Sequence, residues 1–245
     1  MNKLTTNNIT VSYEKTNVIE NISINLNKGE IVSILGVSGV GKTTLFNVIS
    51  GLLAPDFGTV ELDEMNITGK AGYVSYMLQK DLLLPYKTIV DNVSLPLVIK
   101  GEKKSKAREI ADNYFDEFGL EGTQKKYPKQ LSGGMKQRAA LLRTYLFSDQ
   151  VALLDEPFSA LDSITKSNMH DWFLTVMEQI KLSALLITHD IDEAILLSDR
   201  IYIMSGKPGK ISAEIYIKEP KPRDTNFKLS DNFISYKKQI LEILK

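Results

Sequence analysis

The sequence predicts an α/β fold in three parts: a mostly parallel sheet flanked by helices, an N-terminal antiparallel β subdomain and a helical insert. Short apolar runs at 31–35, 151–154 and 184–188 have the composition of buried parallel strands. Segments with helical spacing alternate with these runs, as in βαβ units. From about residue 87 to 147 helical spacing replaces the strand signals, so we expect the helical insert there.

Composition argues against several classes of function. Lys plus Arg and Asp plus Glu both number 30 in the 245 residues, and this balance does not favour nucleic acid as the main partner. The chain has no cysteine and two histidines, so disulfides, thiolate metal sites and a structural zinc site are not expected. No run approaches 18 apolar residues, so action at a membrane would require a partner within it.

The N-terminal residues 4–30 predict short strands. Residues 9–13 and 22–26 alternate apolar and polar side chains, and 27–30 form a turn. Tyr13 ends the first of these runs. On the residues alone it is a half-buried strand aromatic, and the alternative is a stacking platform for a nucleotide base.

Residues 36–44 carry the strongest functional signal. They follow the pattern G-x-x-x-x-G-K-[ST] of a phosphate-binding loop, between the predicted strand 31–35 and a helical stretch that ends near Gly51. Backbone N–H groups at such a helix start can surround an anion, and the helix dipole favours negative charge there. The predicted nucleotide-binding residues of this loop are Gly36, Val37, Ser38, Gly39, Val40, Gly41, Lys42, Thr43 and Thr44.

The residue types of this loop have distinct tasks. The glycines allow the backbone to turn and to approach phosphate oxygens closely. Lys42 supplies a positive charge for the β- and γ-phosphates of ATP, and Thr43 offers a hydroxyl group to Mg²⁺. A plain glycine-rich turn would not need a Lys-Thr pair after its third glycine, so we expect a P-loop NTPase core.

Strand signals continue after the first helix and then give way to helices. Residues 59–63 alternate as a strand, and 72–76 resemble another that leads to Gln79. Spacing alone makes Gln79 an ordinary solvated residue. Residues 103–118 have apolar side chains at helical spacing, and a second helical stretch covers 134–147, which makes the insert mostly helical.

The apolar strand 151–154 ends in two acids, Asp155 and Glu156. Ligands of an open α/β sheet bind at the carboxyl ends of the strands, which places both acids beside the phosphate loop. Asp155 is expected to hold Mg²⁺, which takes oxygen ligands. Glu156 is expected to act as the base or orienting group for an attacking water. Adjacent acids after a strand are otherwise a solvated turn.

A second anion-binding helix start is predicted at residues 132–134. Ser132 is a good N-cap, and Gly133 and Gly134 leave backbone N–H groups bare. Since one phosphate tail needs one cradle, the second suggests that another copy of the chain contributes it. His189 follows an apolar strand, where it could donate a hydrogen bond near the γ-phosphate, although a lone histidine is more often structural.

The α/β pattern returns after residue 151. The chain is then expected to contain, in order, a helix (163–181), a strand (184–188), a helix to about residue 197, a strand pair beginning at 200–204, a connector with Pro220 and Pro222 (218–224) and a helix (230–245).

Together these motifs resemble the ATP-binding subunit of an ABC transporter, from about residue 4 to 217. Tyr13 stands where this family has its base-stacking aromatic, so the resemblance reverses the structural interpretation of Tyr13. Asp162 joins the expected nucleotide-binding residues as part of the D-loop. The matching segments are Walker A (36–43), the Q-loop residue Gln79, the ABC signature (131–137), Walker B (151–156), the D-loop (159–162) and the switch histidine His189.

The resemblance implies how these residues act. It implies a head-to-tail dimer with two ATP molecules between the subunits, in which Ser132 and Gly134 of one chain close on the γ-phosphate held by Lys42 of the other. Gln79 would contact Mg²⁺ or the attacking water, and His189 the γ-phosphate. The helical insert would contact transmembrane permease subunits at the cytoplasmic face of the membrane, and a solute-binding protein would act with them.

One departure from the usual family pattern points to a branch. The fifth signature position is Met135, where Gln is usual. This residue, with segments 83–93 and 198–211, resembles importer ATPases for nitrate, taurine, alkanesulfonates and pyrimidine thiamin precursors, and does not choose among these solutes. We expect an ATPase domain at 1–217 that energises solute import, with its helical part at about 87–147, followed by a connector and helix at 218–245.

Other functions fit parts of the pattern. An ATPase of chromosome maintenance or repair would carry long coiled coils, and the sequence has no sustained heptad run. A P-loop kinase of small molecules would not need the cradle at 132–134. A non-transport ABC ATPase with soluble partners and the ATPase of an exporter stay open on the motifs alone.

Overall fold

The computed structural model describes residues 2–148, 150–221, 223 and 225–244. Pro222 of the predicted connector, and Met1 and Lys245 at the predicted domain ends, lie outside the described residues. The strands are β1 (Asn2–Tyr13), β2 (Thr16–Asn27), β3 (Ile31–Leu35), β4 (Phe57–Leu62), β5 (Met65–Asn66), β6 (Ser75–Met77), β7 (Val151–Asp155), β8 (Ser183–Thr188), β9 (Arg200–Ser205) and β10 (Lys210–Tyr216). The helices are α1 (Lys42–Ile49), α2 (Ile89–Val93), α3 (Leu95–Ile99), α4 (Lys104–Asp112), the 3₁₀ turn η1 (Pro128–Gln130), α5 (Gly133–Phe147), α6 (Ser163–Ile180), α7 (Ile191–Leu197), α8 (Thr225–Lys228) and α9 (Asp231–Leu244).

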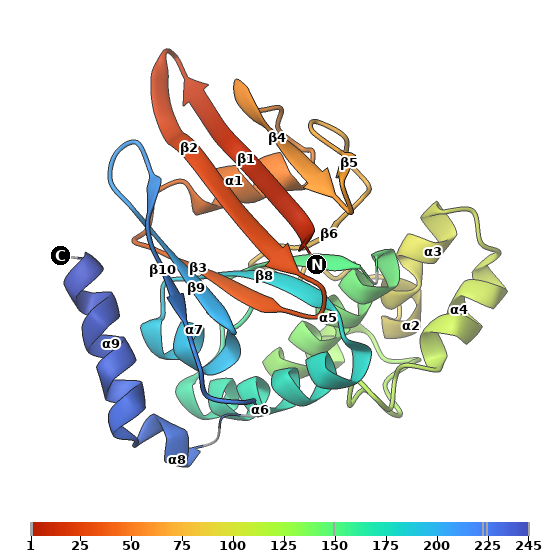
Figure 1. Cartoon of the computed structure of the whole chain (residues 1–245). Helices are drawn as coiled ribbons and strands as arrows, with labels where there is room; N and C mark the ends of the chain where they lie inside the picture. The colour runs from red at the N-terminus through yellow and green to blue at the C-terminus, as the bar shows by residue number, and fades with distance from the viewer. Residues whose placement is uncertain (1, 149, 222, 224, 245) are drawn as a thin grey trace.

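Two sheets organise the molecule (Figure 1). The larger has the strand order β10-β9-β3-β8-β7-β6 and is parallel except for β10, which pairs antiparallel with β9 at one edge. The smaller has the order β2-β1-β4-β5 and is antiparallel throughout. The predicted α/β class, with a mostly parallel sheet and an N-terminal antiparallel β subdomain, is therefore confirmed.

The central strands of the larger sheet are buried on both faces, as expected for parallel strands covered by helices. In β3, Ile31 and Leu35 pack into a core that also contains side chains of α5, α6 and α7. Val32 and Ile34 pack into a second core, on the side of α1 and the smaller sheet. Figure 1 shows α1 between the two sheets and α5 to α7 on the opposite side of the larger sheet.

Helices α2 to α5 lie in the segment predicted to be the helical insert, and α5 packs against α2 and α3 of this segment and against the core helix α6. The predicted helix over 103–118 is only partly right, because α4 ends at Asp112. The N–H groups of Tyr114 and Phe115 then bond to carbonyl groups three residues earlier, at 3.1 Å each. This tighter winding still buries Phe115 and Phe118, so periodicity identified the buried face but not the helix end.

Two predicted strands are displaced in the structure. The strand expected at 72–76 is β6 (Ser75–Met77), because Gly72 has a φ of 97° and belongs to a turn. The strand expected at 59–63 begins at Phe57 and ends before Asp63, whose φ of 47° starts the turn to β5. The order of the elements is unchanged.

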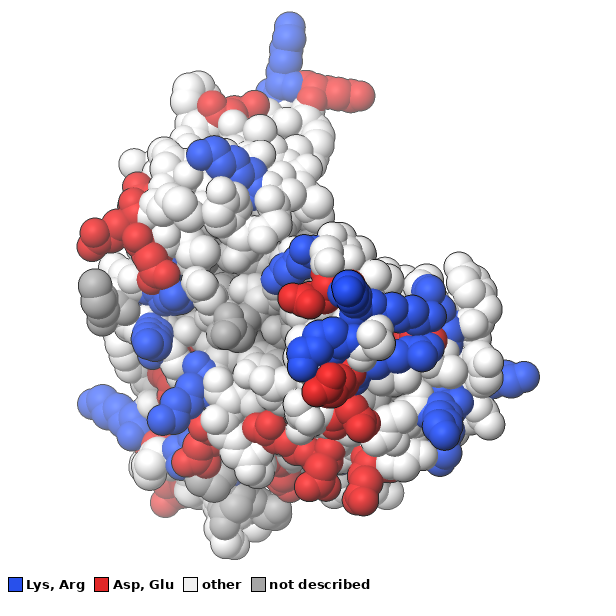
Figure 2. Space-filling model, turned by 90° about the vertical axis from the view of Figure 1, so that its right-hand side faces the viewer, with Lys and Arg blue, Asp and Glu red and all other residues white. Residues whose placement is uncertain are grey.

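The surface around α3 and α4 carries both signs of charge. Figure 2 views the molecule from the side of these helices, where blue side chains gather and red ones lie next to them. This local basic patch coexists with the overall balance of 30 basic and 30 acidic side chains. Among the described residues, no helix is both long enough and apolar enough to cross a membrane.

Arg200 joins one edge of the larger sheet to the smaller sheet. It is 3% exposed at the start of β9. Its Nε and Nη2 donate to the two carboxylate oxygens of Glu30 at 2.5 and 2.9 Å, and its Nη1 donates to Asn25 Oδ1 at 2.8 Å and also to Glu214. Such two-pronged Arg–carboxylate pairs are among the stronger polar contacts in proteins. The pair with Glu30 ties β9 to the start of β3, while the contacts with Asn25 and Glu214 tie it to β2 and β10.

We predict that Arg200→Leu lowers the free energy of unfolding by about 3 kcal/mol, because it leaves the largely buried Glu30 carboxylate without its cation. Denaturant unfolding of the nucleotide-free chain measures the change. The matched control is Lys210→Gln, which removes the exposed Lys210–Glu20 pair of 2.7 Å and should change stability by less than about 1 kcal/mol. Equal effects of the two variants would contradict a structural role for the Arg200 contacts.

Candidate functional site

The phosphate loop connects β3 to α1, and its glycines are required by geometry. Gly39 and Gly41 have φ values of 80° and 103°, where side chains are strained. A Cβ atom on Gly36 would lie 2.4 Å from the carbonyl oxygen of Met204, and one on Gly41 would lie 2.3 Å from Ile19. The backbone can therefore approach a ligand closely here, as a polyphosphate requires.

Lys42 lies inside this loop. It is 6% exposed, and its Nζ donates to the carbonyl oxygens of Gly36 at 2.7 Å and Val37 at 3.0 Å. Burial lowers the pKa of Lys42, against the opposing charges of Glu156 and Asp155. The ammonium group is thus held inside the loop by two of the loop's own carbonyl groups.

The remaining loop residues differ in exposure. Val37 is 59% exposed, whereas Val40 is 3% exposed and packs in the core. Ser38 and Gly39 are exposed, and Thr44 is half-buried on α1. The part of the loop that faces solvent is therefore 37–39.

Asp155 ends β7 next to Thr43. Its Oδ2 accepts hydrogen bonds from Thr43 Oγ1 and from Tyr76 OH, both at 3.3 Å. Burial raises the pKa of Asp155 above its ordinary value. Among the described residues no cluster of three or more His, Cys, Asp or Glu side chains could hold a metal by itself. One carboxylate and one hydroxyl fit Mg²⁺, which usually takes few protein ligands together with substrate phosphates.

Glu156 is the centre of a polar cluster at the same edge of the sheet. Its Oε2 accepts from Gln79 Nε2 at 3.3 Å, and its Oε1 lies 3.0 Å from His189 Nδ1. Gln79 Nε2 also lies 3.2 Å from Ser159 Oγ. Glu156 has a φ of 45°, a conformation that costs about 1–3 kcal/mol and often marks functional sites. The structure thus brings together three predicted catalytic residues from separate parts of the chain.

The other predicted nucleotide-binding residues cap their own helices. Ser132 accepts from Met135 N at 3.3 Å at the start of α5, and Asp162 accepts from Thr165 N at 3.0 Å at the start of α6. A Cβ atom on Gly134 would lie 3.3 Å from Met169 Sδ; Gly133, beside it, is exposed. No hydrogen bond or ion pair among the described residues joins these two helix starts to the phosphate loop of the same chain.

Tyr13 lies at the end of β1, at the tip of the β1–β2 hairpin, and is 51% exposed. The two turn residues Glu14 and Lys15 both have positive φ values, of 49° and 67°, as in the tight turns of hairpins. Further along β2, Ile19 contacts the position of Gly41 in the phosphate loop. The hairpin that carries Tyr13 therefore packs beside that loop.

Sequence reasoning missed a charged group behind His189. Lys166 on α6 lies 2.6 Å from Asp190 and 2.9 Å from Glu193, which is 2% exposed. Burial alone would raise the pKa of Asp190, but Lys166 and backbone N–H groups lower it below its ordinary value. The acid Asp190, directly after His189 in the sequence, could have indicated that a cation lies nearby. Sequence reasoning also missed the hydrogen bond from Tyr76 to Asp155 and the contact between Ser159 and Gln79.

A phosphate loop after β3, with two carboxylates at the end of the parallel strand β7 two places along the same sheet, is typical of a P-loop ATPase. The sequence pattern described as "ABC transporter" matches residues 19–159. The chain is 45% identical over 244 residues to the formylaminopyrimidine import ATP-binding protein ThiZ of Halalkalibacterium halodurans, covering 98% of this chain and 96% of that protein. This protein belongs to the ABC transporter family and is an ATP-binding ATPase of that family.

Further relatives agree with this assignment. The aliphatic sulfonates import ATP-binding protein SsuB of Bacillus cereus is 41% identical over 226 residues, covering 92% of this chain and 87% of that one. Among solved structures, a dimeric post-hydrolysis state of the ATP-binding cassette MJ0796 bound to ADP and Pi has a TM-score of 0.73 and 29% identity, covering 89% of this chain and 100% of that one.

We predict that Asp155→Asn stabilises the nucleotide-free chain at neutral pH and lowers Mg²⁺-dependent ATP hydrolysis by roughly 100-fold. Burial raises the pKa of Asp155. At a pH above this pKa, the ionised carboxylate therefore lowers the stability of the folded chain, and this loss of stability disappears as the pH falls below the pKa. Asn keeps one oxygen to accept from Thr43 and Tyr76 but carries no charge. Thermal unfolding and phosphate release measure the two effects; a lower Tm with unchanged hydrolysis would contradict this role.

Proposed function

We propose that this protein is the ATPase subunit that energises a solute importer from the cytoplasmic face of a membrane. The observation that carries the proposal is the end-to-end match to import ATP-binding proteins, above all the 45% identity to ThiZ over 98% of the chain. The domain bounds 1–217 and 218–245, with a helical part at about 87–147, belong to this proposal.

The phosphate loop binds the nucleotide in this proposal. Lys42 leaves the carbonyl groups of Gly36 and Val37 and pairs with the β- and γ-phosphates. Thr43, Asp155 and Gln79 would hold Mg²⁺, which would supply positive charge to neutralise the phosphates. Tyr13 stacks on the base.

Hydrolysis depends on the cluster around Glu156. Its carboxylate lies between Gln79 and His189, so it orients an attacking water and accepts its proton. His189 donates to the γ-phosphate through the ring nitrogen that does not face Glu156, and Gln79 orients the water. Lys166 positions the His189 loop through its contact of 2.6 Å with Asp190.

A second copy completes the site in this proposal. The N-terminus of α5, with Ser132, Gly133 and Gly134, covers the γ-phosphate of the partner chain, and Asp162 lies at the same interface. The dimeric MJ0796 cassette with ADP and Pi supports this arrangement. ATP favours the closed dimer and hydrolysis releases it, because a ligand shifts an equilibrium by its difference in affinity for the two states.

A groove between the core and the helical insert is suited to a permease. Its volume is about 490 Å³, and its lining is largely apolar. Leu52, Leu82 and Ile99 are 67%, 53% and 74% exposed there, which is unusual for large apolar side chains that stay in water. We assign this groove to a transmembrane permease subunit, and a solute-binding protein would deliver the solute to that permease.

The solute belongs to the nitrate, sulfonate, taurine or thiamin-precursor group in this proposal. Met135, the unusual signature residue, packs against the core at the start of α5, and the ThiZ and SsuB relatives act in formylaminopyrimidine and sulfonate import. Uptake of these solutes into proteoliposomes that contain the chain, its permease and the binding protein tests the proposal. ATP-driven export, or association with soluble proteins alone, would contradict it.

We predict that Glu156→Gln reduces ATP hydrolysis by about 10²–10⁴-fold, because Gln cannot accept the proton of the water. ATP affinity should stay close to that of the wild type, and an ATP-dependent dimer should accumulate on size-exclusion chromatography. Glu121→Gln, an exposed acid of the insert, is the matched control and should be fully active. Wild-type hydrolysis by Glu156→Gln would refute the assignment of the base.

We predict complementation between Ser132→Arg and Lys42→Ala. Each homodimer should be inactive, but a mixed dimer has one intact site if Ser132 of one chain covers Lys42 of the other. Purified mixed dimers should therefore regain about half of the wild-type ATPase rate, since catalytic rates reflect intact sites. Ser132→Ala controls for loss of the helix cap, which costs about 1 kcal/mol. Inactive mixed dimers would contradict the shared site.

We predict that Tyr13→Ala weakens ATP binding by about 1–3 kcal/mol, the range for loss of an aromatic–base stack. Tyr13→Phe keeps the ring and should bind ATP as the wild type does. Calorimetric titration with ATP measures both variants. Because Tyr13 is 51% exposed, stability should hardly change, and unchanged ATP affinity in Tyr13→Ala would return this residue to a structural role.

A further inference from the structure

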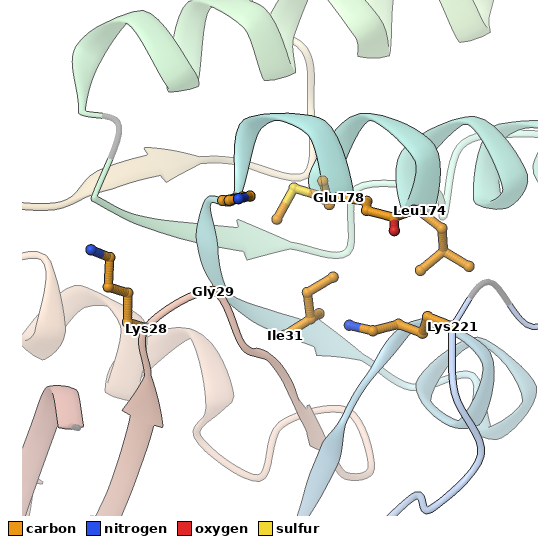
Figure 3. A pocket seen from close by; sticks show the side chains of 8 residues that line it. Lys28, Gly29, Ile31, Leu174, Glu178 and Lys221 are labelled. Carbon is orange, nitrogen blue, oxygen red and sulfur yellow. The ribbon is translucent and has the colours of Figure 1, made fainter.

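A pocket lies beside the start of β3, at the opposite end of this strand from the phosphate loop (Figure 3). Its volume is about 560 Å³, within the range of small-molecule sites. Ile31 on β3 and Leu174 and Met177 on α6 are buried apolar residues of its lining. The pocket can therefore enclose the apolar body of a small ligand.

Three lysines line this pocket from separate parts of the chain; Lys28 and Lys181 are exposed and Lys221 is half-buried. Lys28 precedes β3, Lys181 follows α6, and Lys221 lies in the segment after β10. In Figure 3, Lys28 and Lys221 lie on opposite sides of Ile31. The ion pairs of the described residues include Lys221 with Asp199 at 2.8 Å, but none that involves Lys28 or Lys181.

Local structure explains the positions of Lys181 and Lys221 one at a time, but not why they line the same pocket. Lys181 is the C-cap of α6, with a φ of 50°, where Gly or Asn is usual, and the helix dipole favours a cation there. The ion pair with Asp199 explains the position of Lys221. Neither contact explains why both lysines line the same cavity as Lys28, whose lining also includes buried apolar residues.

We propose that this pocket binds a small organic anion. Its apolar body would lie against Ile31 and the α6 residues Leu174 and Met177. Its carboxylate, phosphate or sulfonate group would lie among the three lysines. Burial of apolar area supplies affinity, and the ammonium groups discriminate in favour of negative charge. Glu178, the acid of the lining, opposes an anion, so its removal should strengthen binding.

The site is separate from the nucleotide site. The five residues of β3 span roughly 15 Å, so an anion beside Ile31 does not touch the phosphate loop. β3 and its parallel neighbour β8 both begin on this side of the sheet, and Gly36 and His189 follow their other ends. A ligand here would therefore bridge the starts of the two strands that carry catalytic residues at their other ends.

Calorimetric titration of the full nucleotide-free chain tests the proposal. The probes are octyl phosphate and octanoate, with octanol and octyltrimethylammonium as controls that lack the negative charge. The Lys28→Gln/Lys181→Gln double variant should bind octyl phosphate about tenfold more weakly, and Glu178→Gln about twofold more tightly. Lys125→Gln, an exposed lysine of the insert, should bind as the wild type does.

Each outcome decides the proposal. Binding of both anions, with these changes in the variants, supports it. No binding, equal binding of octanol, or an unchanged double variant would overturn it. Sedimentation with phosphatidic acid vesicles without binding of octyl phosphate in solution would overturn the assignment to a soluble ligand. Calorimetry requires neither hydrolysis nor a permease, so failure here leaves the proposed function intact.

Discussion

The burial of the larger sheet on both faces is the constraint on which the rest of the structure depends. All five residues of β3 and all five of β7 are buried, so the middle of these strands has little room for groups that bind a polar ligand. Polar side chains are instead placed at strand ends, where loops reach solvent. Gly36, Asp155, Glu156 and His189 all follow or end parallel strands at one edge, and this explains why the chemistry gathers there.

The charged groups of the site lie in an electrostatically unfavourable environment, which the nucleotide and Mg²⁺ of our proposal would improve. Burial raises the pKa of Asp155 and lowers that of Lys42. The contacts of each group therefore do not fully compensate the free-energy cost of removing its charge from water. Glu156 adds a backbone conformation with a φ of 45°. Binding groups that are held ready in this way need little rearrangement when charge develops on the phosphates.

The two ends of the parallel strands have different roles in our proposals. The carboxyl ends carry the phosphate loop and the cluster around Glu156, while a pocket lined by three lysines lies beside the amino end of β3. The starts of α5 and α6 are capped by Ser132 and Asp162; in our proposal the start of α5 covers the γ-phosphate of a neighbouring chain, and Asp162 lies at the same interface. Each chain would then hold half of two nucleotide sites and one complete anion pocket.

The sequence by itself determined the α/β class, the phosphate loop, the acids after β7 and most element positions, because these follow from periodicity and motif spacing over a few residues. Only the tertiary structure decided that α4 ends at Asp112, that Gln79 meets Glu156 across 77 residues of chain, and that Arg200 meets Glu30 across 170. It also decided that three distant lysines line one pocket. Local patterns cannot specify such contacts, because the packing of whole layers brings these residues together.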